Sequence, residues 1–246
     1  MSLRQLIGRT GHFFGSGLDM GVGVPSIEGS LRTLHRLGFR PAFCIDVGAY
    51  QGEWTTLFRS IFLHSKVLMV EAQEAQRPVL QQVRSHHPDE ISMAISLLGS
   101  ADGHRVAFSE MATGSSVFPE SSPYLRSTVT KTTQRLDSLL LAGRYPSVDF
   151  LKLDVQGYEL EVLKGAPAAL SQSTAVLLEA SLMPVNRGCP LVAEIIAFMA
   201  HSRFRLFDFC SQIRRRDGVL WQTDLLFLRE ASSFLPEPAL THDNWH

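Results

Sequence analysis

A regular alternation of strand-like and helix-like segments constrains this chain more than any other feature. Apolar runs at residues 42–47, 66–70 and 91–98 predict strands, and the segments between them, 54–61 and 75–86, carry apolar side chains at helical spacing. Three strands joined by two helices within about 60 residues are typical of a parallel sheet with crossover helices. The sequence therefore predicts an α/β fold.

The alternation is interrupted at residues 99–133 and then resumes. The elements predicted for this half are strands at 105–109, 127–133, 148–153, 175–178, 204–209 and 225–228, and helices at 136–142, 158–164 and 190–201. The pair Asp217-Gly218 is a hairpin signal, so we expect the last two strands to be antiparallel. The preceding Arg214-Arg215-Arg216 is either a solvated hairpin tip or a contact for an anionic acceptor.

The turn after the first strand has the pattern Asp-x-Gly-x-x-x-Gly, from Asp46 to Gly52. Gly48 permits a sharp turn, and Glu71 ends the second strand, where a carboxylate can accept both hydroxyls of a ribose. Tyr50 stands where a dinucleotide site has the glycine that makes room for a pyrophosphate. These residues favour S-adenosylmethionine, which has a ribose and an amino group but no phosphate; a purely structural turn and an NAD site are the alternatives.

Two more acids, Asp154 and Glu179, follow later strands, and the carboxyl ends of parallel strands share one edge of a sheet. Asp46, Glu71, Asp154 and Glu179 are therefore expected to lie together. Because a hydroxyl is a weak nucleophile at neutral pH, we expect a general base or a metal beside it. Asp154 is the candidate base; alternatively, Asp154 and Glu179 share a Mg²⁺ ion.

Several segments resemble the FkbM-type S-adenosylmethionine-dependent methyltransferases. They are Ile45-Asp-Val-Gly-Ala, Glu71-Ala72, Thr132–Leu139 and, most specifically, Leu151-Lys-Leu-Asp-Val-Gln-Gly-Tyr-Glu-Leu-Glu-Val-Leu-Lys-Gly-Ala. The resemblance covers roughly residues 41–228. It implies a Rossmann-like, seven-stranded class I methyltransferase fold, mostly parallel with an antiparallel last strand. It also implies methyl transfer to a hydroxyl of a sugar, glycolipid or natural-product acceptor.

Carried over by position, the resemblance implies a set of site residues. For the cofactor they are Asp46, Gly48, Ala49, Tyr50 and Gly52 at the methionine end, Glu71 and Ala72 at the ribose, and Leu97 and Leu98 at the adenine. The resemblance also implies that Asp154 faces both methyl donor and acceptor. With Glu179, which its strand-end position suggests, Asp154 forms the candidate catalytic pair. Ser115 and Ser116 belong to a loop whose composition suits a cover for the acceptor, with a plain surface loop as the alternative.

Composition narrows the class of protein further. The 23 Lys and Arg residues nearly balance the 24 Asp and Glu residues, which argues against a nucleic-acid partner or a polybasic membrane binder. No apolar stretch is long enough to span a bilayer. Three scattered cysteines are too few for a disulfide framework or a zinc site. We expect a soluble, cytoplasmic protein.

The chain divides into three expected parts. Residues 1–24 contain six glycines and form a flexible or lid-like arm, or a contact in a homodimer. Residues 25–230 form the methyltransferase domain, and 231–246 an irregular tail. Two classes compete with an O-methyltransferase: a catalytically silent cofactor-binding protein, and a nucleic-acid or protein methyltransferase.

Overall fold

The computed structural model describes residues 24–110, 117, 127–184 and 186–236. Its helices are α2 (Ile27–Arg36), α3 (Glu53–Ile61), α4 (Arg77–Ser85), α5 (Leu136–Gly143), α6 (Glu159–Lys164), α7 (Pro167–Gln172) and α8 (Val192–His201), with a 3-10 turn, η1 (Glu74–Gln76). Its strands are β1 (Phe43–Val47), β2 (Lys66–Glu71), β3 (Ile91–Ile95), β4 (Leu97–Leu98), β5 (Arg105–Glu110), β6 (Ser127–Gln134), β7 (Phe150–Leu153), β8 (Ala175–Ser181), β9 (Phe204–Phe209), β10 (Ile213–Arg214) and β11 (Leu220–Arg229).

An eight-stranded sheet forms the centre of the molecule, in the order β10–β11–β8–β7–β1–β2–β3, with β9 also pairing with β11. The strands β3, β2, β1, β7 and β8 are parallel, whereas β11 is antiparallel to both β8 and β9. The predicted, mostly parallel sheet with an antiparallel last strand is confirmed. The sheet has one strand more than the implied seven because the two-residue strand β10 also pairs with β11.

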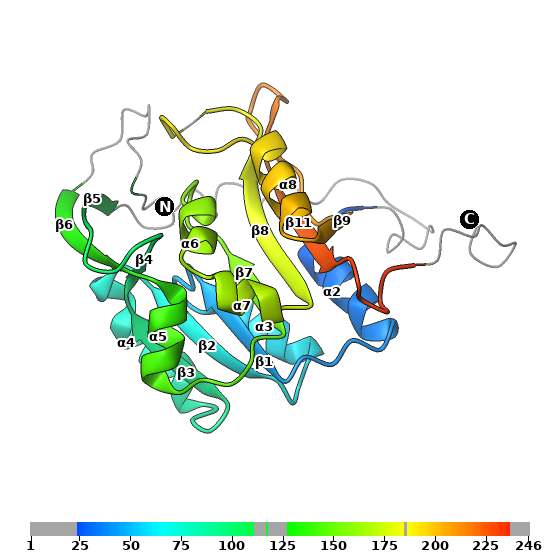
Figure 1. The fold of residues 1–246 in the computed structure, drawn as a ribbon, viewed down its shortest axis with the longest axis horizontal. Helices are drawn as coiled ribbons and strands as arrows, with labels where there is room; N and C mark the ends of the chain where they lie inside the picture. Colours follow the sequence, from blue (N-terminus) through cyan, green and yellow to red (C-terminus); the bar gives the residue numbers. More distant parts are fainter. Residues whose placement is uncertain (1–23, 111–116, 118–126, 185, 237–246) are drawn as a thin grey trace, which may run out of the picture.

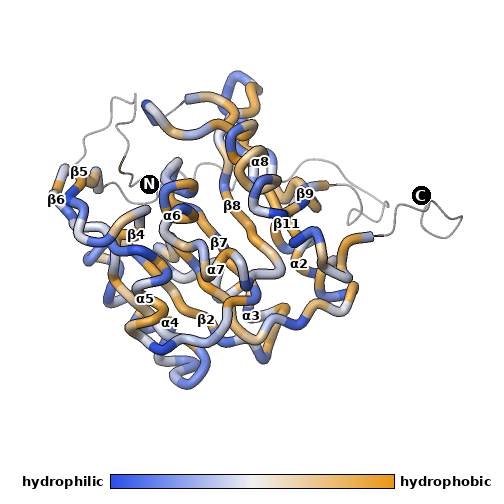
Figure 2. The backbone as a smooth tube through the Cα atoms, viewed as in Figure 1, coloured by the Kyte–Doolittle hydropathy of each residue, from blue (hydrophilic) through white to orange (hydrophobic). Residues whose placement is uncertain are grey.

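Helices cover both faces of this sheet, with α5, α6, α7 and α8 on one face and α2, α3 and α4 on the other (Figure 1). Each face has its own apolar core. Leu163 and Met199 pack on the first face, and Phe58 and Leu80 on the second. The central strands are largely hydrophobic along their length (Figure 2). Since both faces are covered, the carboxyl edge of the sheet is the place for a polar site.

The third strand is shorter than the sequence predicts. It ends at Ile95, and Leu97–Leu98 form β4, which pairs with β6 in a separate three-stranded sheet. The Ser96 N–H donates to the carbonyl of Glu71, which closes the main ladder at this point. The chain is thereby directed across the ends of β2 and β3, where it borders the candidate site.

The later strands are longer than predicted. Strand β8 continues to Ser181 because β11 pairs with it over seven residues, so Glu179 lies within the strand rather than after it. Strand β11 begins at Leu220 instead of residue 225. Helix α7 was absent from the prediction, because six residues show too little of a helical repeat.

The expected arm and tail lie mostly outside the described residues, as does the expected cover loop apart from Val117. The division into arm, domain and tail therefore stays a prediction. Within the described part of the chain, no helix is both long enough and apolar enough to cross a membrane.

Candidate functional site

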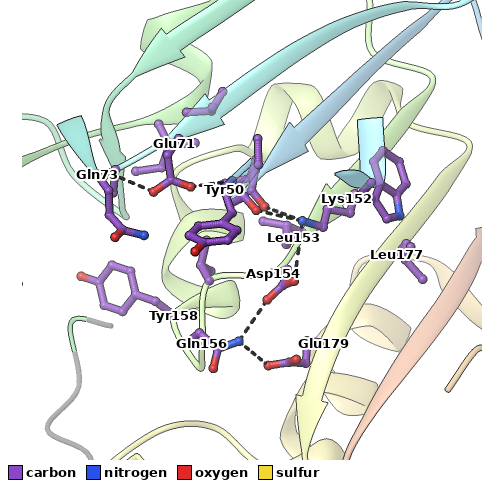
Figure 3. Close-up of a pocket in the computed structure, with 18 of the residues that line it drawn as sticks. Tyr50, Glu71, Gln73, Lys152, Leu153, Asp154, Gln156, Tyr158, Leu177 and Glu179 are labelled. Atoms are coloured by element: carbon purple, nitrogen blue, oxygen red, sulfur yellow. Dashed lines mark hydrogen bonds and ion pairs between the residues drawn. The ribbon is translucent and has the colours of Figure 1, made fainter. Parts of the chain in front are cut away.

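A cavity of about 340 Å³ lies at the carboxyl edge of the sheet, above β1, β2, β7 and β8 (Figure 3). The residues predicted from the sequence that line it are Gly48, Ala49, Tyr50, Glu71, Ala72, Leu97, Leu98, Asp154 and Glu179. Asp46 and Gly52 do not line the cavity, and Ser115 and Ser116 lie outside the described residues. The fold thus brings most of the predicted residues around one space.

The glycines of the turn after β1 are required by packing between neighbouring segments. Gly48 has a φ of +76°, and a Cβ there would lie 1.9 Å from the backbone oxygen of Asp154. Gly52 has a φ of +77° at the start of α3, where a Cβ would meet Val83 at 3.1 Å. A side chain at position 48 would force the ends of β1 and β7 apart. The turn therefore holds these two strand ends in contact beneath the cavity.

Glu71 is held by backbone amides. Its Oε2 accepts a hydrogen bond of 2.8 Å from the Tyr50 N–H, and its Oε1 accepts one of 2.8 Å from the Gln73 N–H. Burial raises the pKa of this carboxyl, and the two hydrogen bonds oppose that rise. Each carboxylate oxygen can accept a further hydrogen bond, so the group keeps capacity toward the cavity.

Asp46 lies beneath the cavity floor, not on its surface. It is fully buried, its Oδ2 accepts a hydrogen bond of 2.7 Å from the Thr55 hydroxyl, and its Oδ1 is 2.9 Å from Lys152 Nζ. A buried charge needs such a partner, because an unpaired ion in the interior is strongly unfavourable. In this structure Asp46 therefore secures Lys152, whereas the sequence placed it at the methionine end of a cofactor.

Lys152 is a site residue to which the sequence analysis gave no role. Its Nζ also donates to the carbonyl of Gly48 at 3.1 Å, approaches Asp154 Oδ2 to 3.8 Å, and lies over the Trp54 ring. The available signal was a lone cation within the apolar strand around Leu151, since a buried lysine requires an acidic partner. Among the described residues that line the cavity, Lys152 is the one Lys or Arg.

Asp154 and Glu179 are joined by the side chain of Gln156. Its Nε2 donates to Asp154 Oδ1 at 3.1 Å and to Glu179 Oε1 at 3.0 Å (Figure 3). Gln222 donates a second hydrogen bond to Glu179, at 2.8 Å. An amide thus stands between the two carboxylates for which a shared Mg²⁺ ion was the alternative to a general base. Within the described residues no group of three or more metal-binding side chains occurs, so the Mg²⁺ expectation is not supported.

The loop that carries Gln156 is fixed from below. The buried side chain of Glu159 accepts hydrogen bonds from the N–H groups of Val155 and Gly157, at 3.0 and 3.1 Å. Asn186 donates to the carbonyl of Gln156 at 2.9 Å. Burial raises the pKa of Glu159 to about 7, against the effect of its backbone hydrogen bonds. Glu159, Asn186 and Gln222 had no role assigned from the sequence.

One wall of the cavity, next to β4 and β5, is apolar. Leu97 and Leu98 from β4, Phe108 from β5 and Tyr158 line it, and all four are buried. A flat aromatic base fits such a wall, and the carboxylate of Glu71 lines the same cavity. Lys152, the one Lys or Arg among the described lining residues, is bound to Asp46, so the described lining has no other side-chain cation for a phosphate. The residues present therefore fit a nucleoside cofactor without phosphates, such as S-adenosylmethionine.

Comparison with known families agrees with this geometry. Residues 46–206 match the methyltransferase FkbM domain. The chain belongs to the FkbM methyltransferase family. The chain therefore contains the methyltransferase domain that the sequence resemblance implied. A search of curated proteins gave no match.

Solved structures of methyltransferases share the fold of this FkbM-family chain. An FkbM methyltransferase from Methylobacillus flagellatus KT has a TM-score of 0.50 at 18% identity, over 76% of this chain and 43% of its own. A proposed O-methyltransferase from Klebsiella pneumoniae has a TM-score of 0.51 at 13% identity, over 92% of this chain and 86% of its own. The chain spans less than half the length of the Methylobacillus protein. At these identities the likeness shows the class I methyltransferase fold.

Proposed function

We propose that this chain is an O-methyltransferase that acts on a hydroxyl of a sugar, glycolipid or other natural-product acceptor. The observation that carries the proposal is the β7–β11 side of the cavity, where Asp154, Glu179 and Asp224 line the wall. Ionised carboxylates accept hydrogen bonds from hydroxyl groups, and a suitably placed carboxylate can remove the proton of the reacting hydroxyl.

On this proposal the cofactor lies along the β1–β2 side of the cavity. Glu71 would bind the ribose, Leu97 and Leu98 would contact the adenine, and the turn from Gly48 to Tyr50 would border the methionine end. When bound, S-adenosylmethionine supplies a methyl group activated by the positive charge on sulfur. The protein's own part is to align an acceptor oxygen and to remove its proton.

Asp154 is the proposed general base. It lines the cavity at the end of β7, and two neighbours fix its carboxylate: Gln156 donates to Oδ1, and Lys152 Nζ lies 3.8 Å from Oδ2. A base must hold one direction while the acceptor approaches, because a misplaced group loses much of its effect. Glu179, held by Gln156 and Gln222, would bind a second hydroxyl of the acceptor.

The remaining wall of this side is apolar and suits the carbon face of a sugar or polyketide-like ring. Trp54, Leu57, Leu177 and Ile213 line it next to the carboxylates. A ring with hydroxyls on its edge and C–H groups on its face would contact both kinds of wall. Because the lining carboxylates outnumber Lys152, a neutral acceptor fits better than an anionic one.

The proposal is tested by transfer of a labelled methyl group from S-adenosylmethionine to a panel of simple glycosides and glycolipids. Asp154→Asn should lower the rate by about 100-fold or more, the usual contribution of a general base, and should leave S-adenosylhomocysteine affinity unchanged. Full activity in this variant would remove Asp154 as the base. Transfer to RNA, DNA or protein, or cofactor binding with no transfer at all, would replace the proposal by one of the alternatives named above.

A further inference from the structure

Gln156 has a backbone conformation that its residue type rarely adopts. Its φ is +54°, in the left-handed region, and Gly157 follows with a φ of +96°. Glycine, asparagine or aspartate adopts this region at lower cost than glutamine. Such strain is retained where the surroundings enforce it, and it occurs preferentially at functional sites. The loop geometry alone therefore does not explain why this position carries a glutamine side chain.

The side chain of Gln156 reaches two carboxylates on neighbouring strands. Asp154 Oδ1 and Glu179 Oε1 both lie within 3.1 Å of its single amide nitrogen, so the two acidic oxygens are close to each other (Figure 3). An ionised carboxylate only accepts hydrogen bonds, and an amide nitrogen has two hydrogens to donate. One side chain thus supplies a donor to each acid. Asparagine, which suits the backbone better, is one methylene shorter.

The loop is fixed so that this side chain keeps its place. Glu159 accepts hydrogen bonds from the N–H groups on both sides of Gln156, those of Val155 and Gly157. Asn186 donates to the carbonyl of Gln156 itself. The backbone is therefore held on both sides of the strained residue while its amide extends toward the cavity, which Gln156 lines.

We propose that Gln156 is a positioning residue that keeps Asp154 and Glu179 apart, charged and directed at the acceptor. Without its two donors, adjacent carboxylates would either repel each other or share a proton. Either outcome would misplace or neutralise the group that removes the acceptor's proton. The inference rests on the proposed function only in treating Asp154 as that base; the pairing of Gln156 with both acids is independent of it.

Other charges face the same pair and define the background of any test. Lys152, held by Asp46 of β1, approaches Asp154 from β7, and Asp224 of β11 lies opposite Glu179 in the strand register. The buried Glu159 of α6 and the cavity-lining Glu53 of α3 add further acidic groups. Acids outnumber the one lysine among these groups, so a third carboxylate at position 156 should be strongly unfavourable when ionised.

The test uses Gln156→Glu, which preserves size and replaces the donor by an acceptor. The ratio of its unfolding equilibrium constant to that of wild type should be at least tenfold larger at pH 8 than at pH 5. This factor corresponds to a difference of about 1.4 kcal/mol in unfolding free energy. At pH 5 the cluster can take up a proton and so regain a donor. Gln81→Glu, on the exposed side of α4, adds the same charge away from the cluster and should show no such pH dependence. Urea unfolding at the two pH values measures both.

The decisive control exchanges the amide of Gln156 with the carboxylate of Glu179. The double variant Gln156→Glu/Glu179→Gln again pairs one amide with one carboxylate at these two positions. It should recover part of the stability that Gln156→Glu loses at pH 8, since Asp154 still faces a carboxylate at position 156. Gln156→Met, which has no donor and adds no charge, should be destabilised at both pH values, with a smaller pH dependence than Gln156→Glu. The inference would be overturned if the stability of Gln156→Glu depended on pH no more than that of Gln81→Glu. It would also be overturned if the double variant were no more stable than the summed effects of its two single substitutions predict.

A parallel titration with S-adenosylhomocysteine keeps this result separate from the proposed function. The cofactor product should bind to wild type and to each folded Gln156 variant with the same affinity, because Glu71 and its amides are untouched. If wild type failed to bind S-adenosylhomocysteine, the proposed function would fail while the exchange result stood. If binding persisted and the exchange gave no recovery, the role of Gln156 alone would fail.

Discussion

The two sides of the cavity hold their acidic groups by different means. On the β1–β2 side, the oxygens of Glu71 accept hydrogen bonds from the backbone N–H groups of Tyr50 and Gln73. On the β7–β11 side, Asp154 and Glu179 depend on the side chains of Gln156 and Gln222. A backbone N–H donor remains after most substitutions of its residue, whereas a side-chain donor is lost through a single substitution. Under the proposed function, the cofactor side is thus held by backbone groups and the acceptor side by side-chain groups.

Lys152 lies below both sides, and its loss should have the largest effect. Lys152→Met would leave the buried carboxylate of Asp46 without its ion-pair partner. Breaking a buried pair in this way costs about 3–5 kcal/mol. We expect urea unfolding to show a loss of that order. Adding Asp46→Asn to Lys152→Met should restore part of it, because the uncompensated charge is gone; an equally unstable double variant would contradict the role assigned to this pair.

Glu159 should make the support of the β7–β11 side dependent on pH. Its pKa is raised by burial from 4.5 to about 7, so between these values the folded state keeps a proton that the unfolded state loses. Folding therefore becomes less favourable as the pH rises from 4.5 to 7, by about 3 kcal/mol if no other group compensates. Below pH 4.5 both states are protonated and this contribution is complete.

Glu159→Gln isolates that contribution. The amide oxygen can still accept from the N–H groups of Val155 and Gly157, but it does not titrate in this range. The difference in unfolding free energy between wild type and Glu159→Gln should change with pH between 4.5 and 7 and stay constant above 8. A constant difference across the whole range would show that the buried acid does not take up a proton.

The same contrast explains which parts of the site the sequence could predict. Gly48 and Glu71 follow from local rules, because a strand-to-helix turn and the residue that ends the next strand are visible in a short segment. The role of Lys152 depends on the register that places it opposite Asp46, more than 100 residues earlier in the chain. No local sequence pattern encodes that register. The lysine could therefore be identified from the sequence, but its pairing with Asp46 could not.

On the β7–β11 side, the unpredicted contacts come from segments that meet only in the folded sheet. Gln222 reaches Glu179 because the long strand β11 inserts beside β8, and the sequence predicted only the last part of β11. The parallel arrangement of the central strands was predictable from the alternation of strands and helices. The ends of β3, β8 and β11 were not, because strand pairing rather than local propensity sets where each strand stops.

Glu71→Gln tests the backbone-held side directly. The variant loses the negative charge that would accept the ribose hydroxyls, and we expect S-adenosylhomocysteine to bind more weakly by about 1.5–3 kcal/mol, the scale of a hydrogen bond to a charged group. Glu179→Gln is the matched control on the other side, and should leave the affinity unchanged. Calorimetry gives both values. Equal losses in the two variants would mean that the cavity is not divided as proposed.

The smallest expected effect separates backbone donors from side-chain donors. Gln222→Met removes one of the two amide donors described for Glu179 while Gln156 keeps the other, so the unfolding free energy should fall by about 1 kcal/mol. Tyr50→Phe changes a cavity-lining side chain on the other side but keeps the N–H that binds Glu71, and should change stability by less than about 0.5 kcal/mol. Urea unfolding of the two variants in the same buffer resolves this difference. A larger loss in Tyr50→Phe would mean that its hydroxyl, rather than the backbone, supports the β1–β2 side. The two substituted residues lie on different sides of one cavity. Comparing their losses of unfolding free energy therefore shows which side depends on side chains.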